Sequence, residues 1–232
     1  MENRILKRNI EALKSLDSGA AARLAGRAPR SAERVAVESA RNGLPTLKIA
    51  CAHGAQVYLH SRVDPAAEAE RKAAGMKLAP GEVPALIGCG LGWLPLALAR
   101  ALEPDRPLVL IEPDPGIFLI ALSTLDWTPV LERRALLLDI SGDPTQIRRR
   151  LNEELPLIVE SKPRIIPVGG DPRRIYGDEA ARWILDAVRD AFVSAALRHR
   201  SLKAMGGMLV FNQIENLPAV LNSSGVGRLA GV

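Results

Sequence analysis

Aromatic residues, cysteines and long hydrophobic runs are all scarce in this chain. Only 3% of its 232 residues are aromatic although 47% are hydrophobic, so its core must consist mainly of Leu, Ile, Val and Ala. Its two cysteines, Cys51 and Cys89, are too few for a disulfide framework, which favours a reducing cytoplasm. No apolar run reaches the roughly 18 residues of a membrane-spanning helix, and the N-terminus lacks a signal-peptide core. We therefore expect a cytoplasmic protein with no membrane span.

Positive charge is concentrated near the N-terminus. The net charge is +5, and residues 1–50 carry ten Lys or Arg against five Asp or Glu, so the rest of the chain is neutral. A basic segment can bind nucleic acid or an anionic surface. These basic residues are spread out, however, with no aromatic residues between them to stack on bases. The pattern indicates a solvated helical face and does not favour nucleic acid as a partner.

The most informative pattern is an apolar run over residues 83–87 that leads into Gly88, Gly90 and Gly92 with the spacing G-x-G-x-G. A second apolar run, residues 107–111, ends at Glu112. Short apolar runs are typical of buried parallel strands. Glycines after the first strand permit a sharp turn close to a ligand, and an acid after the second would face a ribose. These four residues form a candidate nucleotide crevice, with a purely structural turn as the alternative.

The details of the loop limit which cofactor it could hold. Trp93 stands where the dinucleotide fingerprint needs a third small residue, which argues against NAD or FAD. The spacing is that of class I methyltransferases, which hold S-adenosylmethionine at this loop. Leu86, however, replaces the acidic residue that usually lies two positions before the first glycine of that family. No cofactor is firmly implied, and S-adenosylmethionine enters only under the methyltransferase hypothesis.

Other catalytic patterns are weak. His53, His60 and His199 lack metal-ligand spacing, so we expect no metal site. Asp139 and Asp143 follow a predicted strand, where a turn and a helix cap explain them best. Asp64 suits a helix N-cap, with Pro65 at the first helical position.

Strands and helices alternate over most of the chain. We predict an N-terminal helix, an Ala/Arg/Gly-rich linker over residues 19–33 and a three-stranded antiparallel meander over residues 35–60. Beyond these, the predicted strands are 83–87, 107–111, 135–140 and 163–168, and the predicted helices are 66–74, 113–125, 143–154 and 178–204. Such alternation indicates an α/β fold with a Rossmann-like, doubly wound, mostly parallel sheet.

The predicted organisation has three parts. Residues 1–75 form a lobe of the N-terminal helix and the β-meander, and residues 76–205 form the Rossmann-like α/β domain. Residues 206–232 form a helical connector toward a downstream domain.

Three segments together resemble a known family. They are Tyr58-Leu59-His60-Ser61-Arg62-Val63-Asp64-Pro65 with the following Glu68-Ala69-Glu70-Arg71, the glycine loop with Ile111-Glu112-Pro113-Asp114, and residues 211–218. Their order and spacing resemble the N-terminal portion of the motility accessory factor (Maf) flagellin glycosyltransferases, the DUF115 group. The resemblance spans roughly residues 44–221. A related domain occurs in archaeal 6-hydroxymethylpterin diphosphokinases.

The resemblance implies a cytoplasmic bacterial transferase that moves nonulosonic acids from CMP-activated donors to Ser or Thr of flagellin. In that family the catalytic domain follows the portion matched here, so we expect this chain to be a non-catalytic N-terminal module. Its implied partners are a catalytic domain of the same protein and flagellin. A truncated chain and a stand-alone module both remain open, as does the alternative of a methyltransferase.

Overall fold

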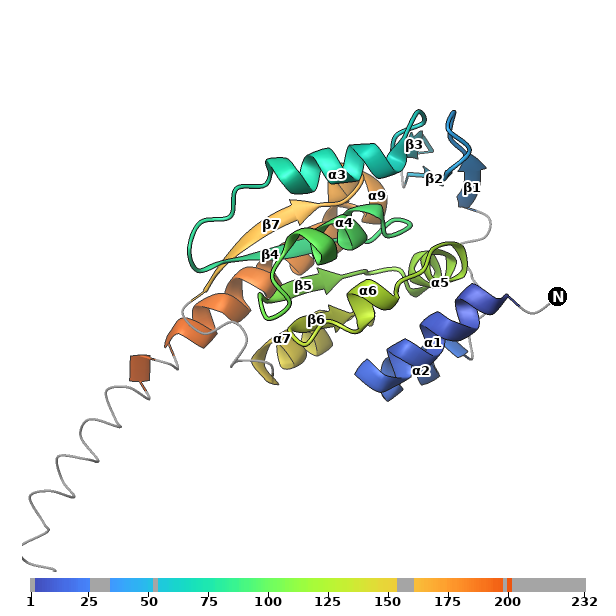
Figure 1. Cartoon of the computed structure of the whole chain (residues 1–232). Helices are drawn as coiled ribbons and strands as arrows, with labels where there is room; N and C mark the ends of the chain where they lie inside the picture. The colour runs from blue at the N-terminus through green and yellow to red at the C-terminus, as the bar shows by residue number, and fades with distance from the viewer. Residues whose placement is uncertain (1–2, 26–33, 52–53, 154–160, 198–199, 202–232) are drawn as a thin grey trace, which may run out of the picture.

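The computed structural model describes residues 3–25, 34–51, 54–153, 161–197 and 200–201. Figure 1 shows a layered α/β molecule with a second, smaller sheet beside the main one. The predicted connector over residues 206–232 lies outside the described residues.

The main sheet consists of four parallel strands, ordered β6-β5-β4-β7. Their bounds are β4 Glu82–Ile87, β5 Leu108–Ile111, β6 Leu136–Asp139 and β7 Lys162–Pro167. Strand β4, the first of the four in the sequence, therefore lies inside the sheet. Strands β5 and β6 lie on one side of it and β7 lies on the other. This order is typical of the Rossmann fold, and ligands of such folds bind where the strand order reverses, here between β4 and β7.

Side chains of the main sheet alternate between two cores because successive residues of a strand point to opposite faces. Val83, Ala85 and Ile87 pack on one face, which α7 (Pro144–Glu153) and a helix over residues 178–197 cover. Leu86 packs on the other face. There the covering helices include α3 (Pro65–Gly75), α4 (Trp93–Ala101), α5 (Pro115–Thr124) and α6 (Thr128–Leu131). Helices on both faces confirm the predicted doubly wound α/β fold (Figure 1).

The second sheet is the predicted antiparallel meander. It consists of β1 (Val35–Ser39), β2 (Pro45–Ala50) and β3 (Gln56–Tyr58), in that order. Val37 pairs with Leu47 and Lys48 pairs with Tyr58. The inward positions of β2, Leu47 and Ile49, are buried, whereas β1 is largely exposed. This sheet leads through residues 59–64 into α3.

The N-terminal helix α1 (Arg4–Leu16) docks on the main unit through Asn9. The buried side chain of Asn9 donates to the carbonyls of Leu122 and Leu125, both at 2.7 Å, and accepts from the amide of Trp127 at 2.9 Å. One polar side chain thus satisfies three backbone groups at the end of α5.

One predicted segment was wrong in part. The linker predicted over residues 19–33 begins instead with helix α2 (Ser18–Ala25), in which Ala20, Ala21 and Leu24 are buried. Residues 26–33 of that prediction lie outside the described residues. Alanine has the highest helix propensity, and packing against α1 supplies the burial that the local pattern does not show. The short helices α6 and α9 (Pro172–Tyr176) were not predicted either.

No helix in the described ranges combines the length and the apolar character that a bilayer crossing requires.

Candidate functional site

The glycine loop, residues 88–92, joins the carboxyl end of β4 to the start of α4. Gly88, Gly90 and Gly92 all have positive φ angles, of 84°, 54° and 108°, which other residues adopt at a cost. Each glycine also faces a side chain from elsewhere in the fold. A Cβ on Gly88 would lie 2.6 Å from the Tyr176 hydroxyl, and a Cβ on Gly90 or Gly92 would collide with His60 or Trp127, respectively. The loop is therefore packed by the protein on three sides.

The backbone amides of the loop donate to acceptors of the protein itself. The donor–acceptor pairs are Gly88 to the Ile111 carbonyl (2.8 Å), Cys89 to Glu112 Oε2 (2.8 Å), Leu91 to His60 Nε2 (2.8 Å) and Gly92 to the Cys89 carbonyl (3.0 Å). In loops that cradle a phosphate, such amides point at the ligand instead. Four of the five loop amides are thus already satisfied.

Glu112 lies where the sequence predicts, at the end of β5 beside the glycine loop. Its carboxylate is fully buried, and Oε2 accepts from the Cys89 amide and, at 3.1 Å, from the Tyr176 hydroxyl. Oε1 accepts from the Asp114 amide at 3.0 Å. Burial in the low-dielectric interior raises the pKa of Glu112 to about 7. The structure brings Glu112 and the three glycines together, but the carboxylate faces the loop rather than an open crevice.

His60 connects the meander to the loop. Its Nε2 accepts the Leu91 N–H, so this nitrogen carries no proton. Burial lowers the pKa of His60 to about 4, which keeps the ring neutral at physiological pH. The Thr46 hydroxyl donates to the His60 carbonyl at 3.1 Å. A neutral histidine is therefore a built-in acceptor for the glycine loop.

The segment that follows His60 begins helix α3. Asp64 Oδ1 accepts from the Ala67 amide at 2.8 Å, which confirms its predicted N-cap role. Glu68 Oε2 accepts from the Ser61 amide at 2.6 Å, and Glu68 Oε1 pairs with Lys72 at 2.8 Å. These contacts fix the chain on both sides of Arg62.

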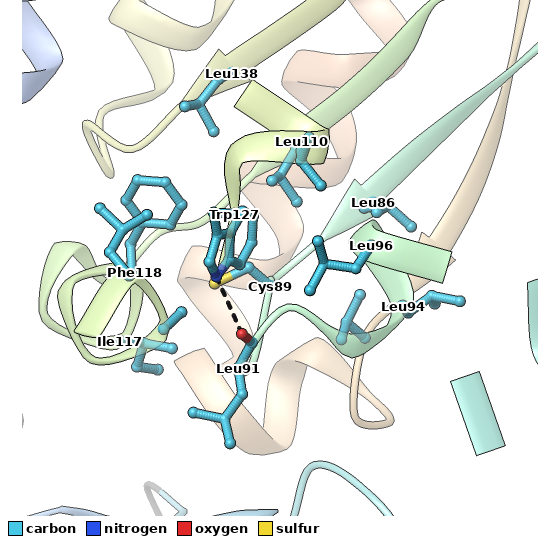
Figure 2. Close-up of a cluster of buried hydrophobic side chains, with 14 of the residues drawn as sticks. Leu86, Cys89, Leu91, Leu94, Leu96, Leu110, Ile117, Phe118, Trp127 and Leu138 are labelled. Carbon is cyan, nitrogen blue, oxygen red and sulfur yellow. Dashed lines mark hydrogen bonds between the residues drawn. The ribbon is translucent and has the colours of Figure 1, made fainter. Parts of the chain in front are cut away.

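Two tryptophans lie beside the glycine loop. The indole of Trp127 is fully buried against Gly92, packs edge-on against Phe118, and donates to the Leu91 carbonyl at 3.2 Å (Figure 2). Trp93, at the start of α4, donates to the Pro45 carbonyl of β2 at 2.9 Å. Indoles need a partner for their N–H when buried, and here both partners are backbone carbonyls.

A cavity of about 340 Å³ lies beside this cluster, at the carboxyl ends of β5 and β6. Tyr176 is one of the residues that line this cavity, and its hydroxyl donates to Glu112 Oε2. The other lining residues are Arg34, Ile49, Pro113, Asp114, Pro115, Ile117, Gly142, Ile175, Ala180 and Trp183. The Arg34 guanidinium donates to the Ala50 and Ile175 carbonyls. The wall of the cavity is both polar and apolar, and the guanidinium of Arg34 is engaged with the backbone.

Asp139, the last residue of β6, and Asp143, which follows the strand, both accept hydrogen bonds from nearby residues of the chain. Asp139 Oδ1 accepts from the amide and the hydroxyl of Ser141, and Asp143 Oδ1 accepts from the Thr145 amide at the start of α7. Within the described ranges no group of three or more His, Cys, Asp or Glu side chains is placed to hold a metal ion.

Sequence reasoning missed three residues of this site: His60, Trp127 and Tyr176. His60 falls inside the segment that carries the family resemblance, which was the one available signal. Tyr176 hydrogen-bonds to a residue 64 positions away and Trp127 to one 36 positions away. No spacing rule connects residues so distant in sequence.

Comparison with known proteins supports the fold. The structure of a Maf glycosyltransferase from Magnetospirillum magneticum AMB-1 is similar to this chain, with a TM-score of 0.56 and 17% sequence identity. The match covers 83% of this chain and 35% of that protein, so this chain spans about a third of its length. No protein-family model matches the sequence, and no curated protein matches it. The chain therefore has a Maf-like fold.

Proposed function

We propose that this chain is a non-catalytic, Rossmann-like module of a Maf-type protein glycosyltransferase that modifies Ser or Thr of flagellin with a nonulosonic acid. Two observations support the proposal. The fold is similar to about a third of a Maf glycosyltransferase, and the candidate nucleotide crevice is filled by the protein's own side chains. The filled crevice is the observation that supports a non-catalytic role for this chain.

The hydrogen bonds of the glycine loop explain why a filled crevice argues against nucleotide binding there. A nucleotide site at this position needs free backbone amides for a phosphate or carboxylate and an acidic side chain turned toward a ribose. Here four loop amides have protein acceptors, and Glu112 accepts from Cys89, Asp114 and Tyr176. Under the proposal the loop stabilises the fold and the nucleotide-sugar is bound by another domain.

The proposal assigns two partners. One is a catalytic domain of the same protein, which the module would support, and the other is flagellin, modified in the cytoplasm before export. Both partners follow from the Maf resemblance.

A class I methyltransferase is the alternative because the G-x-G-x-G loop and Glu112 do meet in space, with 2.8 Å between the Cys89 amide and the carboxylate. The same contact weighs against it, since it uses the acid that would bind the ribose of S-adenosylmethionine.

A transfer assay tests the proposal. Purified chain is incubated with a CMP-nonulosonic acid and unmodified flagellin, beside a full-length Maf-type enzyme as positive control, and flagellin mass is measured. We expect modification only in the control. Sugar transfer by the chain alone would contradict its non-catalytic assignment.

A further inference from the structure

A second cavity, of about 410 Å³, lies on the antiparallel sheet, away from the glycine loop. We call it the basic pocket; its lining residues are Glu38, Ser39, Ala40, Arg41, Thr46, Tyr58, Arg62 and Val63. They come from the end of β1, the turn between β1 and β2 that holds Arg41, the start of β2, the end of β3 and the segment before α3. Its volume lies within the range of small-molecule sites.

Two arginines give the basic pocket its charge. Within the described part of the chain, neither Arg41 nor Arg62 has a carboxylate oxygen within ion-pair distance. The one acidic lining residue, Glu38, pairs with Lys48 at 3.5 Å and accepts from the Tyr58 hydroxyl at 2.7 Å. The single negative charge of Glu38 acts on both Lys48 and, at longer range, Arg62, so the basic side chains around the pocket leave it with a net positive charge.

The backbone holds the two arginines in one place. The Arg41 amide donates to the Arg62 carbonyl at 2.9 Å, and the Asn42 amide donates to the Val63 carbonyl at 3.2 Å. The Arg62 guanidinium lies over the Tyr58 ring, 4.8 Å from its centroid, and the Glu38 contact fixes that ring. Arg62 is thus partly ordered before any ligand arrives, which lowers the entropic cost of binding.

We propose that the basic pocket binds a small molecule carrying a phosphate or a carboxylate, with Arg41 and Arg62 as its ligands. Guanidinium groups match both anions through paired N–H donors. Both positive charges line the pocket and would attract an anion bound in it. This site is separate from the glycine loop and does not depend on the Maf-type proposal.

Calorimetric titration of the chain at low salt tests the site, with pyrophosphate, CMP and N-acetylneuraminate as probes. We expect saturable binding of at least one probe, pyrophosphate or CMP if phosphate is recognised and N-acetylneuraminate if carboxylate is. Arg41→Gln and Arg62→Gln should each weaken it about tenfold or more, the effect of losing one charge-assisted hydrogen bond.

Arg182→Gln is the matched control, because it removes the same charge from an exposed position on the helix over residues 178–197. It should leave affinity unchanged. If Arg62→Gln fails to fold, Arg41→Gln alone decides, since the exposed Arg41 side chain makes no hydrogen bond or ion pair within the described residues. The proposal is overturned if no probe binds at millimolar concentration, or if Arg182→Gln weakens binding as much as Arg41→Gln.

Discussion

At the scale of single residues, side chains from other parts of the fold pack directly against the glycine loop. Gly90 needs its left-handed backbone and has the His60 ring where a Cβ would be. Glu112, fully buried, is held by two backbone amides and the Tyr176 hydroxyl. Each residue of the cluster thus has a structural partner, and substitutions here should affect stability first.

Gly90→Ala should lower the free energy of unfolding by about 2–4 kcal/mol, because it adds backbone strain and forces His60 to move. Gly43→Ala is the control, since Gly43 has a φ of +82° but no atom within 4 Å of an added Cβ. Its loss should stay near 1 kcal/mol, from backbone strain alone. Urea unfolding measures both, and equal losses would show that contact with His60 is not what requires glycine.

Glu112→Gln should change how stability depends on pH. The pKa of Glu112 in the folded protein, about 7, exceeds its ordinary value of 4.5, so between these values the folded state binds more protons than the unfolded state. This contribution stabilises the wild type below about pH 4.5 and is lost as the pH rises through 7. The wild type should therefore lose up to about 3 kcal/mol relative to Glu112→Gln between pH 4.5 and 8.

His60 acts in the opposite direction, because its folded pKa of about 4 lies below the ordinary value of 6.5. Its contribution is present above about pH 6.5 and is lost as the pH falls through 4. Both the wild type and Glu112→Gln contain His60, so its contribution cancels when their free energies of unfolding are subtracted at each pH. A difference that does not vary with pH would mean that Glu112 is not buried as described.

At the scale of secondary-structure elements, the sequence predicted those whose residues carry their own periodic signal. The four parallel strands are apolar runs, and Asp64 with Pro65 marks the start of α3. Helix α2 was missed because its small side chains give no periodic pattern and its burial depends on α1. The spacing of Gly88, Gly90, Gly92 and Glu112 correctly predicted that they meet, because the ends of adjacent parallel strands coincide. The side chains that fill the crevice come from distant elements, so local patterns could not show them.

Asp64→Ala should lower the free energy of unfolding by about 1 kcal/mol, because the Ala67 amide loses its side-chain acceptor. Asp64→Asn keeps an acceptor at the same position and should lose much less. Denaturant unfolding of both variants gives the comparison. Equal losses would mean that the charge of Asp64, rather than the N-cap hydrogen bond, stabilises this helix.

At the scale of the whole molecule, a Rossmann-like sheet keeps the loop geometry of a nucleotide-binding fold while its crevice is filled from three sides. The segment after β3 supplies His60, α9 supplies Tyr176 and the segment before α6 supplies Trp127. The antiparallel sheet therefore packs against the edge where a ligand would enter. In fold, this arrangement is similar to about a third of a Maf glycosyltransferase.

The central claim is that the glycine loop is structural, and a thermal-shift titration with S-adenosylhomocysteine tests it most directly. A ligand at about 100 times its Kd adds roughly 2.7 kcal/mol, which should raise the melting temperature of a domain of this size by about 5–10 °C. We expect no saturable shift, in the wild type or in Glu112→Gln. A saturable shift in the wild type that Glu112→Gln abolishes would contradict the claim and establish a nucleoside site at the loop.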